Sequence, residues 1–398
     1  MLLLEVLLGA AALVVLALVL ILSVEVLSAS SSTEGEPEPM GARPRLAVII
    51  PAHDKASGIR DTLQCLTPQL RNGDRLLVVA DNCRDDTASI AAAAGAEVVV
   101  RTDPSRRGKG YALDHGLRHL QLDAPPEVVL IIDADCRVSE GSVDRLARVC
   151  ARTGRPVQAL NLSHAPPGAG LGMRIAEFAF ALKNHVRPLG LRRLGVPCQL
   201  TGTGMAFPWA CISTATLGTG HIVEDLKLGL ELTSAGSPPL FCPQARVASD
   251  FPASGDGFKS QRTRWEHGYL GVLVTDAPTV LLKALSTGNR QLLALGLDLC
   301  VPPVALLTLL SVAVWLASAL FYAVARGAVP LLIASAAAAL LMLSVLTSWA
   351  RYGRQILSLG SLALAIAYAF LKIPLYFRFL VARQFEWVRT KRDEDRPS

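Results

Sequence analysis

The feature that most constrains the fold of this chain is a set of long apolar runs near its two ends. Val6–Val24 is about long enough to cross a bilayer as a helix. Leu299–Val324 and Val329–Ala350 have the same character, and the shorter run Ile356–Leu371 follows them. The chain between these runs is more polar. This uneven distribution predicts a multi-pass membrane protein with a soluble middle portion.

The N-terminal run has two interpretations, a retained anchor and a cleaved signal peptide. The start Met1-Leu-Leu-Leu-Glu5 has no positively charged region, and the apolar run is longer than the core of a typical signal peptide. We therefore expect an uncleaved anchor. The segment after it is rich in Ser, Glu and Pro, which is typical of a flexible linker.

The C-terminal runs leave the membrane topology open. Ile356–Leu371 could cross the bilayer or lie in its interface. If it crosses, the basic segment Arg389–Arg392 lies on the same side as the N-terminus. The positive-inside rule instead prefers that segment in the cytoplasm, with the soluble middle.

The charge and cysteine patterns exclude some classes of protein. The net charge of +6 is modest, and no Lys/Arg block is interleaved with aromatic residues, so we expect no nucleic-acid partner. Much of the basic excess lies beside apolar runs, where membrane lipid explains it. The eight cysteines follow neither a zinc spacing nor a disulfide framework, which indicates reduced thiols in a cytosolic domain.

From Leu46 onward, short apolar runs alternate with helical stretches. This alternation is typical of a doubly wound, largely parallel α/β sheet. We expect strands at Leu46–Ile50, Leu76–Ala80, Glu97–Val100 and Val128–Ile132. We expect helices between them at Ile59–Leu70, Thr87–Ala94 and Gly110–Leu122.

Acidic residues follow these strands where the carboxyl ends of a parallel sheet would meet. Asp133 and Asp135 end the fourth strand, and because residues two apart in an extended chain point the same way, we expect the two acids to converge. Such a pair could hold a divalent metal that carries a diphosphate, although an Asp at a strand end is often only a turn residue. Pro51 and His53 follow the first strand, and Asp81 begins an acidic turn after the second. The set indicates a nucleotide site.

Three later stretches add further candidates, each with a plainer structural alternative. Lys109 precedes a helix, where it could meet phosphate or simply belong to a solvated basic loop. Glu224 and Asp225 begin a helical run, as catalytic acids or as ordinary partners of the helix dipole. The segment Gln261–Trp265 puts a glutamine, an arginine and a tryptophan on one helical face. That face suits a sugar chain and an anionic leaving group, or anchoring in the membrane interface.

Together these motifs resemble a family 2 glycosyltransferase of the membrane-embedded polysaccharide-synthase type, which includes cellulose, hyaluronan and poly-N-acetylglucosamine synthases. The matching motifs are Ile50-Pro-Ala-His-Asp54, Asp81, Asp133-Ala-Asp135, Glu224-Asp225 and Gln261-Arg-Thr-Arg-Trp265. The resemblance implies a GT-A fold, a UDP-sugar donor, Mg²⁺ or Mn²⁺, and inversion at the anomeric carbon.

The resemblance also implies roles for individual residues. Asp135 would ligate the metal, and Asp225 would be the general base. Donor and nucleotide contacts would come from Pro51, His53, Asp81, Lys109 and Asp133. The pyrophosphate and the acceptor end would be held by Gln261, Arg264 and Trp265. The stretch Gly202–Ala206 resembles a loop that lines the acceptor site.

The chain departs from the family pattern in two turns. Asp54-Lys55 stands where the family usually shows Asn-Glu, so an acidic donor contact is lost or replaced. Asp81-Asn-Cys83 stands where it usually shows Asp-Gly-Ser. There are also fewer spans than in cellulose synthase, which leaves a self-contained translocation channel in doubt.

The expected organisation follows from these motifs: an anchor at 1–27, a linker at 28–45, a GT-A catalytic domain at 46–270, an interfacial connection at 271–298, a C-terminal transmembrane region at 299–382 and a basic tail at 383–398. The enzyme would lie in the cell membrane, the inner membrane in bacteria, with its catalytic domain in the cytoplasm. Its expected partners are a UDP-sugar, a glycan or lipid acceptor, membrane lipid, and export or polymer-translocation subunits.

Three alternatives remain beside a polysaccharide synthase. A glycolipid synthase similar to ceramide glucosyltransferases shares the plan, but it uses a lipid acceptor. A catalytically silent sugar-nucleotide binder or scaffold would lack a metal acid or a base, and here both positions are filled. A nucleotidyltransferase would need neither the Gln261–Trp265 helix nor the spans.

Overall fold

The computed structural model describes residues 1–29, 41–218 and 223–381. These residues form two compact units. The sheet unit comprises residues 41–166, 196–218 and 223–268, and the helical unit comprises residues 1–29, 167–195 and 269–381. Helix α10 (Gly255–Thr275) begins in the sheet unit, and its residues from Tyr269 onward belong to the helical unit.

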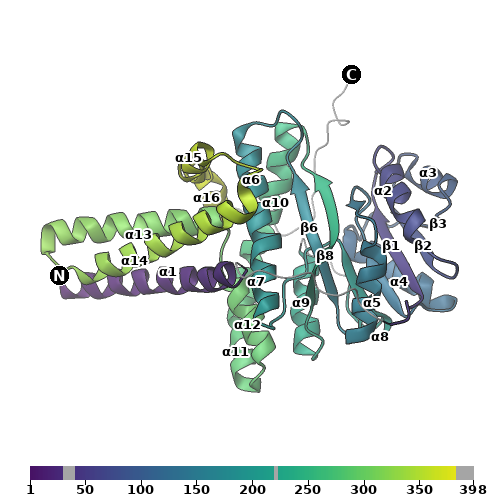
Figure 1. Cartoon of the computed structure of the whole chain (residues 1–398), viewed down its shortest axis with the longest axis horizontal. Coiled ribbons are helices and arrows are strands. Elements are labelled where there is room, and N and C mark those ends of the chain that lie inside the picture. Colours follow the sequence, from purple (N-terminus) through teal and green to yellow (C-terminus); the bar gives the residue numbers. More distant parts are fainter. Residues whose placement is uncertain (30–40, 219–222, 382–398) are drawn as a thin grey trace. The chain divides into compact units, whose positions relative to one another are not determined.

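A mixed sheet forms the core of the sheet unit (Figure 1). Its strands are β1 (Leu46–Ala52), β2 (Arg75–Asp81), β3 (Glu97–Arg101), β4 (Val128–Ile131), β5 (Arg137–Val138), β6 (Val157–His164), β7 (Met205–Pro208) and β8 (Leu240–Asp250). They lie in the order β3-β2-β1-β4-β7-β6-β8-β5. The strands from β1 to β4 pair in parallel, as predicted, whereas β7 runs antiparallel to both β4 and β6. The sheet is therefore less parallel than the sequence indicated.

Both faces of the sheet are covered, which explains why its strands read as continuous apolar runs. Alternate residues of β1 point to opposite faces: Val48 joins a cluster with Leu63 of α2 and Leu146 of α5. Ile49 joins a second cluster with Leu113 of α4. The helices of this unit before α10 are α2 (Ile59–Leu66), α3 (Thr87–Ala93), α4 (Lys109–Leu122), α5 (Ser142–Thr153), α8 (Trp209–Ile212) and α9 (Glu224–Ser234), with a 3₁₀ turn at Thr67–Gln69.

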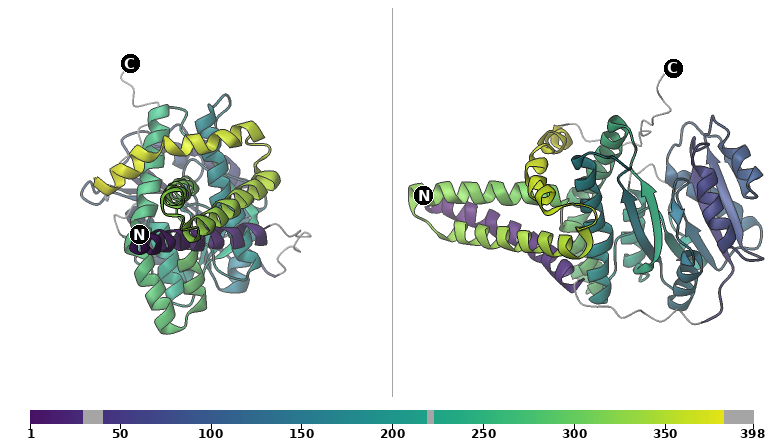
Figure 2. Two further views of the ribbon diagram at one scale, coloured as in Figure 1. Left: turned by 90° about the vertical axis from the view of Figure 1, so that its left-hand side faces the viewer. Right: turned by 45° about the horizontal axis from the view of Figure 1, so that its top comes forward.

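The helical unit is built on three long helices that run side by side (Figures 1 and 2). They are α1 (Leu2–Ser28), α13 (Val304–Ala325) and α14 (Val329–Ser348), and each packs against the other two. The other helices are α6 (Leu171–Ala181), α7 (Arg187–Arg193), α11 (Ala277–Thr287), α12 (Arg290–Cys300), α15 (Leu359–Phe370) and α16 (Ile373–Val381). Two π-helical turns, Leu182–Val186 and Trp349–Gly353, extend α6 and α14.

Four helical segments of the described chain are long and apolar enough to cross a membrane: Leu2–Ser28, Val304–Ala325, Val329–Gly353 and Leu359–Val381. They contain most of the apolar runs that the sequence predicted. A fifth candidate joins α10 to α11 across a bend of 43°. The first half of α10 carries Lys259, Arg262 and Arg264, which are costly in hydrocarbon, so α10 suits a bilayer core poorly.

The last candidate span lies differently from the other three. Helices α15 and α16 cross the end of the bundle instead of running along it (Figures 1 and 2). Leu362 of α15 shares a hydrophobic cluster with Phe178 of α6, and Tyr376 of α16 belongs to a cluster against which Leu306, near the start of α13, packs. This placement within the helical unit matches an interfacial helix better than a span.

A buried ionic cluster ties three helices of this unit together. Arg187 of α7 donates to Glu25 of α1 at 2.6 Å and to the Asp298 carboxylate of α12 at 2.5 Å. These three residues are 6%, 1% and 3% exposed. Gly190 allows the close approach, because a Cβ there would lie 1.8 Å from the carbonyl oxygen of Glu25.

Candidate active site

The two acids after β4 contact different lysines and do not lie on an extended strand. The strand ends at Ile131, and a turn at Ala134-Asp135 follows, so the alternation of an extended chain does not apply to them. Asp133 accepts a hydrogen bond from Lys109 at 2.5 Å, whereas Asp135 accepts one from Lys55. Each carboxylate therefore has its own lysine. Partial removal from water raises the pKa of both carboxyls, and the charge of Lys109 opposes the rise.

Lys109 interacts with residues from three parts of the sheet unit. It is the first residue of α4, and besides Asp133 its ammonium donates to the carbonyl oxygen of Gly202 at 2.7 Å. Gly202 has a φ of +87°, and a Cβ there would lie 3.3 Å from Asp225 Oδ2. Lys109, Asp133, Gly202 and Asp225 thus meet in one small region. In this structure Lys109 holds the site together, while its predicted phosphate contact stays a prediction.

Lys109 and the acids around it change one another's pKa values. Burial would lower the pKa of the Lys109 ammonium, but Asp133, Glu224 and Asp225 outweigh it and raise that pKa above its ordinary value. Burial, together with the neighbouring Asp225 carboxylate, raises the pKa of Glu224 to about 8. Glu224 therefore holds a proton at neutral pH, which limits the negative charge beside Asp225.

The raised pKa of Glu224 makes stability depend on pH. The folded chain binds a proton that an unfolded chain releases near pH 4.5, so this contribution is fully present below about pH 4.5 and is lost as the pH rises through about 8. We expect the unfolding free energy of the wild type, relative to Glu224→Gln, to fall across that window. Urea denaturation of both proteins at several pH values measures the difference. A difference that is constant across the window would contradict the assignment.

Asp81, the predicted nucleotide contact, lies at the end of β2 and is 6% exposed. Its Oδ1 accepts hydrogen bonds from Arg101 at 2.6 Å and from the Asn82 side chain at 3.0 Å. Its main-chain oxygen lies 2.7 Å from His53 Nδ1, which brings the ends of β1 and β2 together. Pro51 lies within β1 and pairs in register with Val79 of β2. Burial raises the pKa of Asp81, and Arg101 opposes the rise.

The predicted Gln261, Arg264 and Trp265 lie on one helix, α10, and are half-buried. Burial lowers the pKa of Arg264, and the charges of Glu224, Asp133 and Asp135 oppose that decrease. Arg264 thus acts on the same acids that surround Lys109. Within the described ranges it forms no direct ion pair with them, so its charge is not neutralised by contact.

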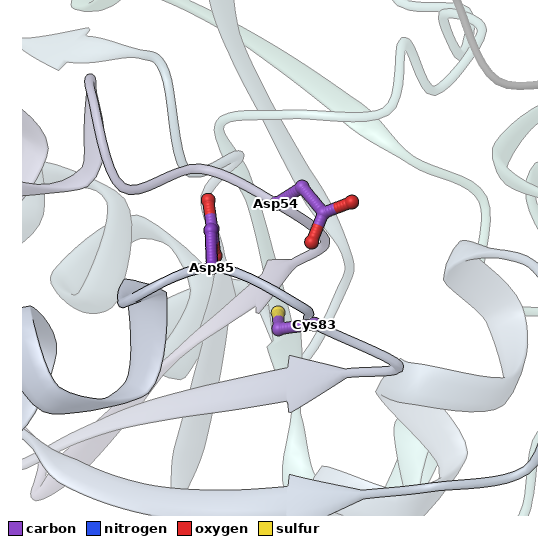
Figure 3. A group of neighbouring side chains, drawn as sticks. All are labelled: Asp54, Cys83 and Asp85. Atoms are coloured by element: carbon purple, nitrogen blue, oxygen red, sulfur yellow. The ribbon is translucent and has the colours of Figure 1, made fainter.

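A separate acidic cluster lies in the loops after β1 and β2 (Figure 3). Asp54, Cys83 and Asp85 each offer a ligand atom within 4.8 Å of the others. Both carboxylates accept hydrogen bonds from main-chain N–H groups of these loops. Asp54 accepts from the Arg84 N–H at 2.7 Å, and Asp85 accepts from the Ala56 N–H at 2.9 Å. A thiol is also a poor ligand for Mg²⁺ or Mn²⁺, so Asp135 remains the better candidate for metal.

Sequence reasoning assigned no role to Lys55 or Arg101, and it did not predict the protonation of Glu224. Lys55 was noted only as a departure, although a lysine that replaces a family acid is itself a signal. Arg101 ends β3 beside Asp81, and its pairing follows only from the strand register. Glu224 had the signal of adjacency to Asp225, but its protonation depends on burial. His221, in the stretch before Glu224, lies outside the described residues.

The mixed α/β sheet with acids at its strand ends agrees with the predicted GT-A fold class. Residues 44–268 match the family described as "Glycosyltransferase like family 2". The match covers more than half of the chain, and the chain therefore belongs to this family.

Similar proteins agree with this membership. An uncharacterized glycosyltransferase of Mycobacterium tuberculosis is 30% identical over 177 residues, which are 38% of this chain and 77% of that protein. The structure of the mannosyltransferase PcManGT from Pyrobaculum calidifontis, in complex with GDP-Man and Mn²⁺, has a TM-score of 0.53 at 19% identity. The similarity covers 94% of this chain and 97% of PcManGT, so the shared fold extends over almost the whole chain. The Mn²⁺ in that complex is consistent with the predicted use of Mg²⁺ or Mn²⁺.

A second structure is more distant. It is glucosyl-3-phosphoglycerate synthase from Mycobacterium tuberculosis, in complex with Mn²⁺, UDP and phosphoglyceric acid. The identity is 19%, the TM-score is 0.37, and the similarity covers 56% of this chain and 78% of the synthase.

Proposed function

We propose that this chain transfers a sugar from a UDP-sugar, with inversion at the anomeric carbon, to an acceptor held at the membrane. The observation that carries the proposal is the meeting of Lys109, Asp133 and Asp225 around Gly202, next to Asp135. This arrangement supports a base for the acceptor, a donor contact and a metal ligand within one region of a family 2 glycosyltransferase.

Each of these residues has its own role in the proposed sugar transfer. Asp225 accepts the proton of the acceptor hydroxyl as that oxygen attacks the donor sugar. Asp133 and Asp81 bind the donor, with Pro51 and His53 forming the wall beside Asp81. Arg264 stabilises the charge of the departing diphosphate, and Gln261 and Trp265 orient the acceptor end.

Asp135 has the donor chemistry that a hard divalent metal prefers. Its carboxylate is 43% exposed and supplies oxygen ligands, so Mg²⁺ or Mn²⁺ fits the residues present. When bound, the metal would neutralise the diphosphate of the donor. The GDP-Man complex of PcManGT makes GDP-sugars the alternative donors to test.

Two acceptor classes follow from the family, a growing polysaccharide and a membrane lipid. The packing of the helical unit favours the lipid. Helices α1, α13 and α14 pack against one another, and Ser23 of α1 contacts Ser344 of α14 at 2.9 Å. A closely packed bundle of three helices leaves no room for a polymer inside it, so polysaccharide export would need a partner subunit.

Product analysis tests the proposal. Proteoliposomes that contain the purified chain are given radiolabelled UDP-Glc, UDP-GlcNAc, UDP-Gal or GDP-Man with Mn²⁺, together with bacterial lipid extract. Label that enters organic solvent indicates a lipid acceptor, and label of high molecular weight indicates a polymer. No transfer from any donor of the panel would count against the reaction itself.

The helices of the helical unit also support a membrane topology. We propose that α1, α13 and α14 span the membrane and that α15–α16 lie in the interface on the cytoplasmic side. This arrangement places Arg389–Arg392 in the cytoplasm, as the positive-inside rule prefers. It avoids the conflict that arises if Ile356–Leu371 crosses the bilayer. We expect a fusion at Gly327 to be active with alkaline phosphatase and a C-terminal fusion to fluoresce with green fluorescent protein. A C-terminal fusion active with the phosphatase would instead make α15–α16 a fourth span.

A further inference from the structure

Lys55 is one residue of this site to which the proposed reaction assigns no role. It follows β1, where the family usually has an acid, and its ammonium contacts Oδ2 of Asp135 across the edge of the sheet. We propose that Lys55 occupies the metal-binding carboxylate before the donor arrives and thereby lowers its affinity for free divalent metal. The inference rests on the proposed role of Asp135.

The backbone of Lys55 is fixed on both sides. Its N–H donates to Thr87 Oγ1 at 2.7 Å, and Thr87 is fully buried. Its carbonyl oxygen accepts from the N–H groups of Gly58 at 3.1 Å and Ile59 at 3.0 Å, where α2 begins. The start of α2 and the start of α3 therefore hold the main chain of this lysine in place. Only its side chain needs to move.

The side chain is also more enclosed than its partner. The side chain of Lys55 is 16% exposed and that of Asp135 is 43% exposed, so the carboxylate is the more accessible partner of the pair. The ammonium of the ion pair is thus largely shielded from water, while the carboxylate stays accessible to a second cation.

The consequence is a competition between two cations for one carboxylate. A divalent ion at Asp135 must either share the carboxylate with an ammonium, against like-charge repulsion, or displace that ammonium. A nucleoside diphosphate adds negative charge that can hold both cations at once. Lys55 therefore makes metal binding depend on the nucleotide, so that the free enzyme binds metal weakly and the donor brings the metal with it.

The test measures Mn²⁺ binding by electron paramagnetic resonance of the full-length chain in detergent, with and without UDP. We expect Lys55→Met and Lys55→Gln to bind Mn²⁺ without UDP about tenfold more tightly than the wild type, as for other changes beside metal ligands. Lys55→Arg keeps the positive charge and should stay close to the wild type.

Arg75→Met is the matched control. Arg75 is 20% exposed and pairs with Glu97 at 2.6 Å, so its removal also deletes one positive charge from an ion pair of the same unit. It should leave the Mn²⁺ affinity unchanged. If Asp135→Asn does not weaken Mn²⁺ binding in the presence of UDP, the proposed metal site is wrong. If Asp135→Asn abolishes binding but Lys55→Met and Lys55→Gln match the wild type, only the role of Lys55 is overturned.

Discussion

Replacing Asp225 with asparagine is expected to lower the turnover number by a factor of about 10² to 10⁴, the usual contribution of a positioned general base. Asparagine keeps the size of the side chain but cannot accept the proton of the acceptor hydroxyl. The Lys109 ammonium and the Asp133 carboxylate remain in place, so the affinity for UDP should be unchanged. Transfer of radiolabelled sugar, with UDP affinity from calorimetry, measures the two quantities separately.

The matched control for this change is Glu231→Gln. Glu231 lies on the same helix, α9, and its side chain is exposed. The substitution removes one carboxylate from the helix without touching the site, and transfer should remain at the wild-type rate. An Asp225→Asn enzyme with near-wild-type turnover would show that another group takes the proton.

Replacing Arg187 with methionine is expected to cost about 3–5 kcal/mol of stability in the helical unit, because it leaves two buried carboxylates without their counter-ion. Glu25 and Asp298 are 1% and 3% exposed, so water cannot replace the lost guanidinium. Denaturant-induced unfolding of the purified chain in mixed micelles, followed by tryptophan fluorescence, measures the loss.

Two further variants separate the ionic cluster from a general effect of losing an arginine. Arg290→Met lies on α12, the helix that carries Asp298, at an exposed position, and should change stability by less than about 0.5 kcal/mol. Combining Arg187→Met with Glu25→Gln and Asp298→Asn removes all three charges and should recover much of the loss. If Arg187→Met is as stable as the wild type, the cluster does not stabilise the unit.

The parallel half of the sheet could be predicted to within about two residues from its apolar runs. Strands β1 to β4 are covered on both faces, and the helices between them are amphipathic, so the periodicity changes visibly along the chain. Strands β5 to β8 give no such signal. β5 has two residues, and β7 pairs with strands far away in the sequence, so only tertiary contacts assign them.

The structure brings several of the predicted site residues near one another, while their roles stay predictions and their geometry could not be read from the sequence. Lys109 links Asp133 to Gly202, beside Asp225, but β4 ends two residues before Asp133, so the alternation of a strand does not apply to Asp133 and Asp135. The lysine partners hold these two carboxylates in place. Lys55 and Asp135 lie 80 positions apart in the sequence, so their contact could not be predicted from it. Arg187 could not be placed either, because a basic residue in a sequence is normally exposed and its burial depends on two acids from distant helices.

The most direct test of the central claim is metal-dependent release of UDP by the purified full-length chain. The wild type and Asp135→Asn are incubated with a panel of UDP-sugars and a membrane lipid extract, with Mn²⁺ or with EDTA. The account predicts release of UDP by the wild type with Mn²⁺, which EDTA abolishes and which Asp135→Asn lacks. Release that persists in EDTA and in Asp135→Asn, or no release with any donor, would contradict it.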